Sequence, residues 1–336
     1  MIPRVAIIYN HPEQDRYSAM GEQKAVLGVL IEVKAVHAGL AKLGYVVEQV
    51  PISPPLEAVK QTISQLAVDA VFNLFEGFAG RPETEAAVAA MLSDFGVPYT
   101  GCSAAALSLT LDKPRTKEIL QSNGLPTPPF RVLDPDILDE FDLNYPCIVK
   151  PAAEDASHGL SEHSVVTDTG SLETQVRHIS ELYNGQALVE EYVDGREFNV
   201  SVIGNDQPVV LPVSEIVYTL PDGMPRILTF EAKWEPQSLY FKSSAPVCPA
   251  DIDDVIRQRI AGPALSAYRL LGCTGYARVD FRMGADSIPQ IIEVNANPDL
   301  SPGYGVALQS RLAGMSYARM IERIMHLAME RNAVGA

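Results

Sequence analysis

The 336-residue chain lacks the positive charge that marks proteins of nucleic acids and membrane surfaces. Its 26 lysines and arginines are outnumbered by 42 aspartates and glutamates, which gives a formal net charge of -16 at neutral pH. A surface with this excess of negative charge repels nucleic acids and anionic membranes. We therefore expect neither as a partner, and any anionic ligand must meet a local group of cations or a metal ion.

Cysteine is scarce and long apolar runs are missing. The four cysteines, Cys102, Cys147, Cys248 and Cys273, show no Cys-x-x-Cys spacing, which favours free thiols in a reducing compartment over disulfides or a zinc site. No apolar run approaches the ~20 residues that span a bilayer, and the first residues turn polar too soon for a signal peptide. These features predict a cytoplasmic protein.

Several short catalytic motifs are also absent. No Gly-x-Gly-x-x-Gly follows the first predicted strand, and the sequence has neither a Walker Gly-Lys-Ser/Thr nor a Gly-x-Ser-x-Gly. Dinucleotide binding by the first lobe, P-loop chemistry and serine hydrolysis are therefore disfavoured. What is present, 47 % hydrophobic and 20 % charged residues, is typical of a globular protein with two or three packed units.

The order of predicted elements divides the chain into units at residues 1–106, 107–193 and 194–336. In the first unit, strand patterns near 4–9, 45–50 and 69–74 alternate with helical patterns, which predicts a parallel sheet in a Rossmann-like lobe. The second unit mixes short strands with two helices, and the third is rich in strands before its helices. The predicted fold class is therefore α/β followed by α+β.

The most informative local pattern places Arg278 and Asp280 on one predicted strand and Glu293 and Asn295 on the next. An antiparallel hairpin centred on 286–287 sets Asp280 opposite Glu293 and Arg278 opposite Asn295. Carboxylate and amide oxygens that face each other in this way suit Mg²⁺, and the arginine would meet a phosphate or an oxyanion. The residues alone are equally consistent with an exposed polar face of a hairpin.

Three lysines stand at the ends of predicted elements, at positions 113, 150 and 233. Lys150 ends an apolar run and precedes the small-residue loop 152–159, where backbone N–H groups can approach a phosphate. The alternative is that each lysine is simply a surface residue, as most lysines are.

A strand pattern at 187–193, a turn at Asp194 and Gly195, and a second strand pattern suggest a hinge between two units. Exposed backbone at such a hinge can pair with the edge of an adenine, and Glu197 can accept a ribose hydroxyl. An ordinary hairpin with a charged outer face would show the same pattern.

Taken in order along the chain, these residues resemble the ATP-grasp enzymes, and within them the D-alanine:D-alanine ligase family. Stretches similar to the family's motifs lie at 98–101, 112–117, 195–198, 272–280 and 293–295. The resemblance implies an ATP-grasp fold, in which a Rossmann-like lobe precedes two α+β domains that clamp ATP. It also implies a homodimeric, ATP-dependent carboxylate:amine ligase that acts on small molecules through an acyl phosphate and forms an amide or dipeptide bond.

The resemblance further implies roles for individual residues. The implied ATP site consists of Lys113, Lys150, Lys233, Glu190, Glu191, Tyr192, Val193 and Glu197. The implied ligands of two Mg²⁺ ions, or of Mn²⁺ in their place, are Asp280, Glu293 and Asn295. The implied catalytic groups are Arg278, Lys233 and Ser157.

The amino-acid side of the family pattern is different in this chain. The turn after the first strand lacks the family's glycines, so Glu13 or Glu22 would have to hold the first ammonium group. Asp299 stands where the family has a glycine, and Tyr304 where it has a carboxylate-binding serine. Three alternatives stay open: a true D-alanine:D-alanine ligase, a ligase of specialised metabolism that joins an amino acid to another carboxylate, and a nucleotide-binding protein without turnover.

Overall fold

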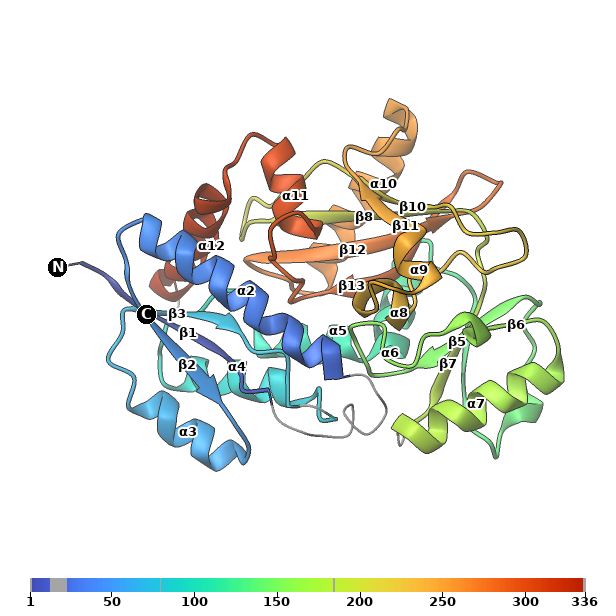
Figure 1. The fold of residues 1–336 in the computed structure, drawn as a ribbon, viewed down its shortest axis with the longest axis horizontal. Helices are drawn as coiled ribbons and strands as arrows, with labels where there is room; N and C mark the ends of the chain where they lie inside the picture. The colour runs from blue at the N-terminus through green and yellow to red at the C-terminus, as the bar shows by residue number, and fades with distance from the viewer. Residues whose placement is uncertain (1, 13–22, 79, 184, 335–336) are drawn as a thin grey trace.

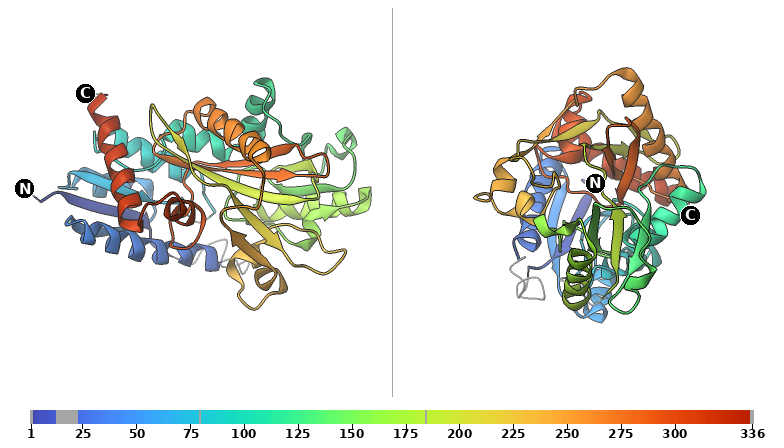
Figure 2. Two further views of the ribbon diagram at one scale, coloured as in Figure 1. Left: turned by 90° about the horizontal axis from the view of Figure 1, so that it is seen from above. Right: turned by 90° about the vertical axis from the view of Figure 1, so that its right-hand side faces the viewer.

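A computed structural model describes residues 2–12, 23–78, 80–183 and 185–334, which form three sheets covered by helices (Figure 1). Strand β1 and the last helix, α12, lie at one end of the elongated molecule, and the strands of the largest sheet extend toward the other (Figure 2). The sheets and their helices bring widely separated parts of the chain to the middle of the molecule.

The N-terminal lobe contains the predicted parallel sheet, in the order β2-β1-β3. Its strands are β1 (Arg4–Asn10), β2 (Val46–Ile52) and β3 (Ala70–Leu74). Its helices are α2 (Gln23–Lys42), α3 (Leu56–Ser64) and α4 (Thr84–Asp94). All of β3 and nearly all of β1 is buried, because helices cover both faces of a parallel sheet.

The middle of the chain forms an antiparallel sheet in the order β4-β7-β5-β6. Its strands are β4 (Phe130–Leu133), β5 (Cys147–Pro151), β6 (Val165–Val166) and β7 (Ala187–Glu191). The helices that precede or cover it are α5 (Ala104–Leu111), α6 (Lys113–Ser122) and α7 (Thr169–Tyr183). Leu172, Val176 and Ile179 repeat at helical spacing on α7 and pack on this sheet.

The largest sheet has the order β11-β10-β8-β12-β13, with β9 paired to β8. Its strands are β8 (Arg196–Ile203), β9 (Val209–Val210), β10 (Ser214–Tyr218), β11 (Ser244–Val247), β12 (Tyr276–Met283) and β13 (Pro289–Asn295). The helices around it are α8 (Phe230–Trp234), α9 (Leu239–Lys242), α10 (Asp254–Leu270), α11 (Gly305–Leu312) and α12 (Tyr317–Val334).

The hairpin of β12 and β13 has the predicted pairing at its functional end: Arg278 faces Asn295 and Asp280 faces Glu293. The predicted centre of the turn is wrong, however. Next to the turn, Phe281 pairs with Ile291, which is one residue out of step with the pairing beyond it. A β-bulge between Asp280 and Phe281 absorbs this step, since a bulge sets one extra residue against its partner strand.

Helix α11 is fixed to the sheet by a fully buried glutamine, Gln309. Its Nε2 donates to Asn199 Oδ1 at 2.8 Å and to Ser214 Oγ at 2.9 Å, and its Oε1 accepts the Ser201 N–H at 2.8 Å. Every polar atom of this amide has a partner, as burial requires. Because α11 follows the loop that leaves β13, this anchor also limits where residues 296–304 can lie.

Replacing Gln309 by leucine keeps the volume but leaves the Ser201 N–H and the Asn199 and Ser214 side chains without their partner. We expect the free energy of unfolding to fall by about 2 to 4 kcal/mol, measured by urea denaturation. The exposed Gln207 is the matched control, and Gln207→Ala should change stability by less than about 0.5 kcal/mol. An equal loss in both variants would contradict the anchoring role.

Candidate active site

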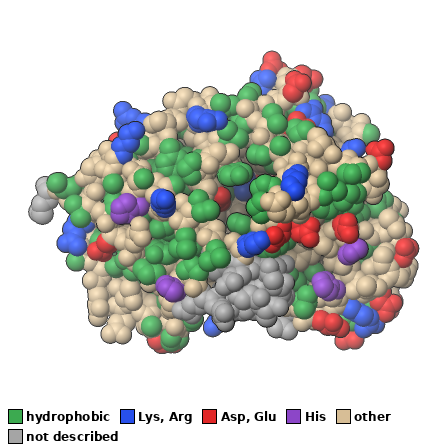
Figure 3. All heavy atoms as spheres, in the orientation of Figure 1, with side chains coloured by type: hydrophobic (Ala, Val, Ile, Leu, Met, Phe, Trp, Pro, Cys, Tyr) green, Lys and Arg blue, Asp and Glu red, His purple; other side chains and the backbone are tan. Residues whose placement is uncertain are grey.

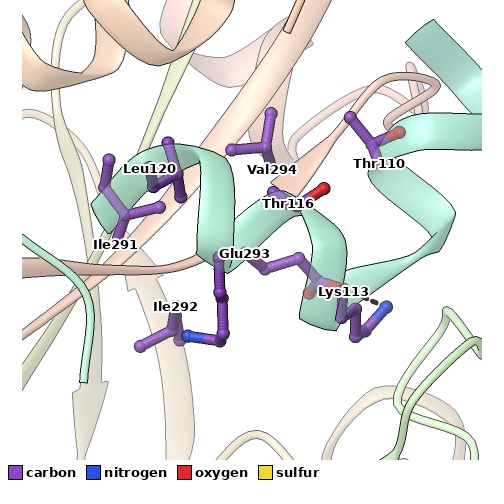
Figure 4. A pocket seen from close by; sticks show the side chains of 9 residues that line it. Thr110, Lys113, Thr116, Leu120, Ile291, Ile292, Glu293 and Val294 are labelled. Carbon is purple, nitrogen blue, oxygen red and sulfur yellow. Dashed lines mark ion pairs between the residues drawn. The ribbon is translucent and has the colours of Figure 1, made fainter. Parts of the chain in front are cut away.

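A buried ion pair joins α6 to the largest sheet. Lys113 begins α6, whose N-cap Asp112 accepts the Arg115 N–H at 3.0 Å. Its Nζ lies 2.8 Å from Glu293 Oε1 and 3.0 Å from Asp155 Oδ1. Figure 4 shows Lys113 and Glu293 directed toward each other from α6 and β13. The contact joins residues of the second and third predicted units.

These contacts keep both groups of the pair charged. Burial favours the neutral amine of Lys113, but Asp155 and Glu293 outweigh it and raise the pKa above its ordinary value. Burial likewise opposes ionisation of Glu293, yet Lys113, Lys150 and Lys233 together hold the pKa of its carboxyl well below the usual range. Glu293 is therefore ionised at neutral pH and surrounded by lysines.

A second buried carboxylate, Glu190 on β7, pairs with both Lys117 and Lys150. Despite burial, the two lysines lower the pKa of Glu190, whereas burial lowers that of Lys117 to about 8. Lys117 also donates to Thr127 Oγ1 at 2.6 Å. Lys117 is not among the predicted site residues. Its spacing of four residues from Lys113 could have indicated it, because residues at this spacing share one face of a helix.

Arg278 and Asp280, two residues apart on one face of β12, form a two-pronged ion pair with both N···O distances at 2.7 Å. Asp280 outweighs the effect of burial and raises the pKa of Arg278. Lys233 lies within electrostatic reach of Arg278, Asp280 and Glu293, and its pKa is lowered first by burial and then by Arg278. The structure thus brings the predicted phosphate and metal residues together and pairs the predicted metal-binding carboxylates with cations.

The loop 152–159 lies against α8, which carries Lys233. The Trp234 Nε1–H donates to the Ala156 carbonyl at 3.3 Å, and the Phe230 N–H donates to the Leu160 carbonyl at 3.0 Å. Ser157 has a φ of 61°, which lies in the left-handed region. Residues other than glycine rarely adopt this conformation outside tight turns. The loop 152–159 and the helix that carries Lys233 are therefore in contact.

The predicted hinge residues lie where β7 leads into β8. Tyr218 Oη donates to Glu197 Oε2 at 2.7 Å, and Arg282 Nη1 lies 3.2 Å from the same oxygen. Arg282 also stacks on the ring of Tyr192, with its Cζ 5.1 Å from the centroid. Arg282 and Tyr218 escaped the sequence analysis, because their contact with Glu197 depends on the pairing of β8 with β10 and β12.

Part of the backbone of this hinge forms hydrogen bonds within the protein. The N–H groups of Glu191 and Tyr192 donate to the carbonyls of Pro129 and Pro146 at 3.0 and 2.8 Å. The Glu191 carboxylate accepts the Asn144 N–H at 3.0 Å, so it points away from the lysines of the site. Within the described residues, the N–H of Val193 has no hydrogen-bond partner and is free to bind a ligand.

Only two of the four residues predicted to contact an amino acid lie within the described part of the chain. Glu13 and Glu22 lie outside the described residues. Asp299 is exposed in the loop after β13, where its Oδ1 accepts the Ser301 N–H at 2.7 Å. Tyr304 is 55 % exposed and stands at the N-cap of α11. In Figure 3 a hollow opens near the middle of the face shown, with acidic and basic side chains beside it.

Three glutamates near this loop were missed. Burial and the charges of Asp299 and Glu76 raise the pKa of Glu32 on α2 well above its usual range. Desolvation and the charge of Asp299 raise the pKa of Glu76 to about 8, and burial also raises the pKa of Glu85. Only Glu32 has a sequence signal: it lies within the apolar stripe that Val29, Val33, Val36 and Leu40 form on α2.

The described ranges contain neither a membrane-spanning helix nor a cluster of metal-binding side chains. None of their helices is both long enough and apolar enough to cross a bilayer. Nor do three or more His, Cys, Asp or Glu side chains in those ranges converge on a common point as a metal-binding group. Asp280 and Glu293 with the amide of Asn295 are therefore a set of two carboxylates and one neutral oxygen.

Comparison with known proteins shows the family. Residues 119–326 match the family model described as "D-ala D-ala ligase C-terminus". A Sinorhizobium fredii protein named "Uncharacterized protein y4sG" is 36 % identical over 261 residues, 78 % of this chain and 75 % of that protein. The "D-alanine--D-alanine ligase" of Cupriavidus taiwanensis is 32 % identical over 275 residues, 80 % of this chain and 79 % of that enzyme.

A structural comparison confirms the expected fold. The crystal structure of the Bacillus anthracis D-alanine–D-alanine ligase complexed with ATP superposes with a TM-score of 0.76 over the whole of both chains, at 19 % sequence identity. The predicted ATP-grasp architecture is therefore correct. On this evidence the chain belongs to the D-alanine–D-alanine ligase C-terminal family of ATP-grasp, carbon–nitrogen bond-forming ligases.

Proposed function

We propose that this chain joins a carboxylate to an amine in two steps at the site described above. A carboxylate oxygen attacks the γ-phosphorus of ATP and ADP leaves, which gives an acyl phosphate. The nitrogen of the amine then attacks the acyl carbon, phosphate leaves, and the amine proton passes to solvent. The observation that carries the proposal is the convergence of Lys113, Lys150, Lys233 and Arg278 in one partly buried cleft.

The charges suit this chemistry. Phosphoryl transfer demands positioning and neutralisation of phosphate oxygens rather than a covalent role for the protein. Lys113 and Lys150 are held in place by carboxylates, so they would present fixed positive charge to the α- and β-phosphates. Lys233 would act on the γ-phosphate, and Arg278, oriented by Asp280, on the charge that develops during transfer. Ser157 would contribute from the adjoining loop.

The donor set near β13 fits Mg²⁺. Glu293 is ionised, Asp280 faces it across the hairpin, and the Asn295 amide oxygen lies one pleat further along the same strand as Glu293. These three residues would hold the ion or ions that accompany ATP, or Mn²⁺ in their place. Such a cation supplies neutralisation of phosphate charge when bound.

We assign the adenosine to the hinge. The free N–H of Val193 suits the edge of an adenine, with Glu190, Glu191 and Tyr192 lining the same segment. Glu197, held by Arg282 and Tyr218, would accept a ribose hydroxyl. In this assignment residues 107–193 and 194–336 are the two units that close on ATP, and amino acids or related small molecules bind toward residues 1–106. A homodimer in the cytoplasm remains a prediction from the family.

The direct test is release of phosphate and ADP from Mg-ATP in the presence of D- and L-amino acids, singly and in pairs, with mass analysis of the products. We expect release that depends on both a carboxylate and an amine, together with an amide product. Release with D-alanine and formation of its dipeptide would assign the family's named activity to this chain. ADP release that no carboxylate stimulates would contradict the proposal.

Removing a phosphate-binding charge should slow turnover strongly. Lys150→Ala should lower the rate of ADP formation by about 10² or more, because the lysine neutralises transferring charge. Glu293→Gln should lower it by a similar factor through loss of the ionised metal ligand. Lys60→Ala on the exposed face of α3 is the control and should leave turnover unchanged. Wild-type rates in Lys150→Ala and Glu293→Gln would remove both residues from the site.

Arg278 should act on the rate more than on nucleotide binding. For Arg278→Ala we expect kcat to fall by about 10² or more while the Kd for ADP changes less than about threefold. Steady-state kinetics and calorimetric titration of ADP separate the two effects. A loss confined to nucleotide affinity would show that the guanidinium binds the ground state instead.

A further inference from the structure

A glycine inside α2 makes room for the single tryptophan of the chain. A Cβ atom at Gly28 would lie 2.7 Å from Trp234 Cζ3 and 2.8 Å from Trp234 Cη2, closer than a real Cβ comes to another heavy atom. Glycine weakens the interior of a helix relative to alanine, and the helical backbone at Gly28 does not need the conformational freedom of glycine. The missing side chain is therefore explained by the close approach of the indole ring.

Trp234 is the last residue of α8, and its contacts fix this helix on two sides. In Figure 1, α2 crosses in front of the N-terminal sheet toward α8. On the side of α2, the indole packs on Gly28, and the next residue, Glu235, pairs with Lys24. On the side of the small-residue loop, the indole Nε1–H donates to the Ala156 carbonyl at 3.3 Å. The indole thus lies between the N-terminal lobe and the loop after β5.

The residue before Trp234 is Lys233, so the place of the indole determines the place of the lysine. Helix α8 has five residues, too few to be stable through its own hydrogen bonds, and its position depends on its neighbours. Its other end is held as well, since the ring of Phe230 lies 5.6 Å from that of His158. A displacement of about 1 Å of a group that acts on a reacting centre costs up to about 10² in rate.

We propose that the contact of Trp234 with Gly28 positions Lys233 for the γ-phosphate of ATP. This inference rests on the proposed ligase function, which assigns Lys233 to that phosphate. Any side chain at position 28 would push the indole, and with it α8 and the lysine, out of place. Gly28 and Trp234 act through Lys233, so they are positioning residues, and one of them belongs to the N-terminal lobe rather than to the two units that close on ATP.

The test is Gly28→Ala, with ADP and the non-hydrolysable ATP analogue adenylyl imidodiphosphate titrated calorimetrically into the full chain in Mg²⁺. We expect the Kd for the analogue to rise about tenfold, because a displaced lysine loses its charge-assisted contact with the γ-phosphate. The Kd for ADP should change less than about threefold, because ADP lacks that phosphate. The value of kcat should fall by about tenfold or more.

Two further measurements show whether the glycine acts as proposed. Added to Lys233→Ala, the change Gly28→Ala should not weaken analogue binding further, because its effect passes through the lysine. A loss of the same size in that background would overturn the inference. Since the chain has one tryptophan, its fluorescence reports on the contact directly. Gly28→Ala should shift the emission to longer wavelength and increase quenching by acrylamide, and unchanged emission and quenching would contradict the contact.

Gly262→Ala is the matched control, because Gly262 lies exposed within α10 and a Cβ there would meet no atom within 4 Å. It should leave both Kd values, kcat and the emission unchanged. Trp234→Phe keeps the test decisive if Gly28→Ala fails to fold, since the shorter ring cannot fill the same place and should also weaken analogue binding selectively. An equal loss of affinity for ADP and for the analogue in both variants would overturn the positioning role.

Binding and turnover separate this inference from the ligase function. If no carboxylate stimulates ADP release but Gly28→Ala still weakens binding of the analogue and not of ADP, the positioning role stands and the ligase proposal fails. If ADP release depends on a carboxylate and an amine, yet Gly28→Ala matches the wild type in kcat and in analogue affinity, the ligase proposal stands and the positioning role is wrong.

Discussion

A lysine that is 6 % exposed stays charged only where carboxylates surround it, and Lys113 meets this condition through Glu293 and Asp155. The two carboxylates come from β13 and from the loop after β5, so one side chain links three parts of the molecule. The same ion pair limits how ligands can bind. A phosphate can replace Glu293 as the partner of Lys113 only if Glu293 gains another cation. A metal ion can replace Lys113 as the partner of Glu293 only if Lys113 gains another anion. A nucleotide and its metal ion together satisfy both conditions.

The sequence predicted the geometry of β12 and β13 because the residues at their functional ends alternate with apolar ones, and alternation determines which side chains share a face. Asp280 does face Glu293, yet the pairing near the turn is one residue different. The bulge between Asp280 and Phe281 restores the expected pairing. The extra residue is Ile292 on β13, where two adjacent isoleucines break the apolar alternation, but such a doublet does not show that the strand stays paired through a bulge. The strands of the N-terminal lobe were predicted within about two residues, because their apolar patterns are strong.

The electrostatic interaction of Glu32, Glu76 and Asp299 could not be predicted, because these residues lie about 45 and 220 residues apart and belong to no common motif. Glu32 does interrupt an apolar helical stripe, which is a signal that a glutamate is buried, but the sequence gives no indication of what it faces. Lys117 could have been found by its helical spacing from Lys113. Arg282 and Tyr218 could not, since they meet Glu197 only across the strands that flank β8. Local spacing thus found the groups that share an element, and the tertiary structure was needed for the others.

The ionisable groups of the site fall into two sets. The lysines and Arg278 lie near β7 and β13 and are paired with carboxylates that keep them charged. Glu32 lies on α2 and Glu76 follows β3, and burial together with neighbouring carboxylates raises the pKa of each. At neutral pH the first set therefore carries charge, whereas the second is largely protonated. The formal net charge of -16 therefore overstates the negative charge of this region, because that count treats every carboxyl group as ionised.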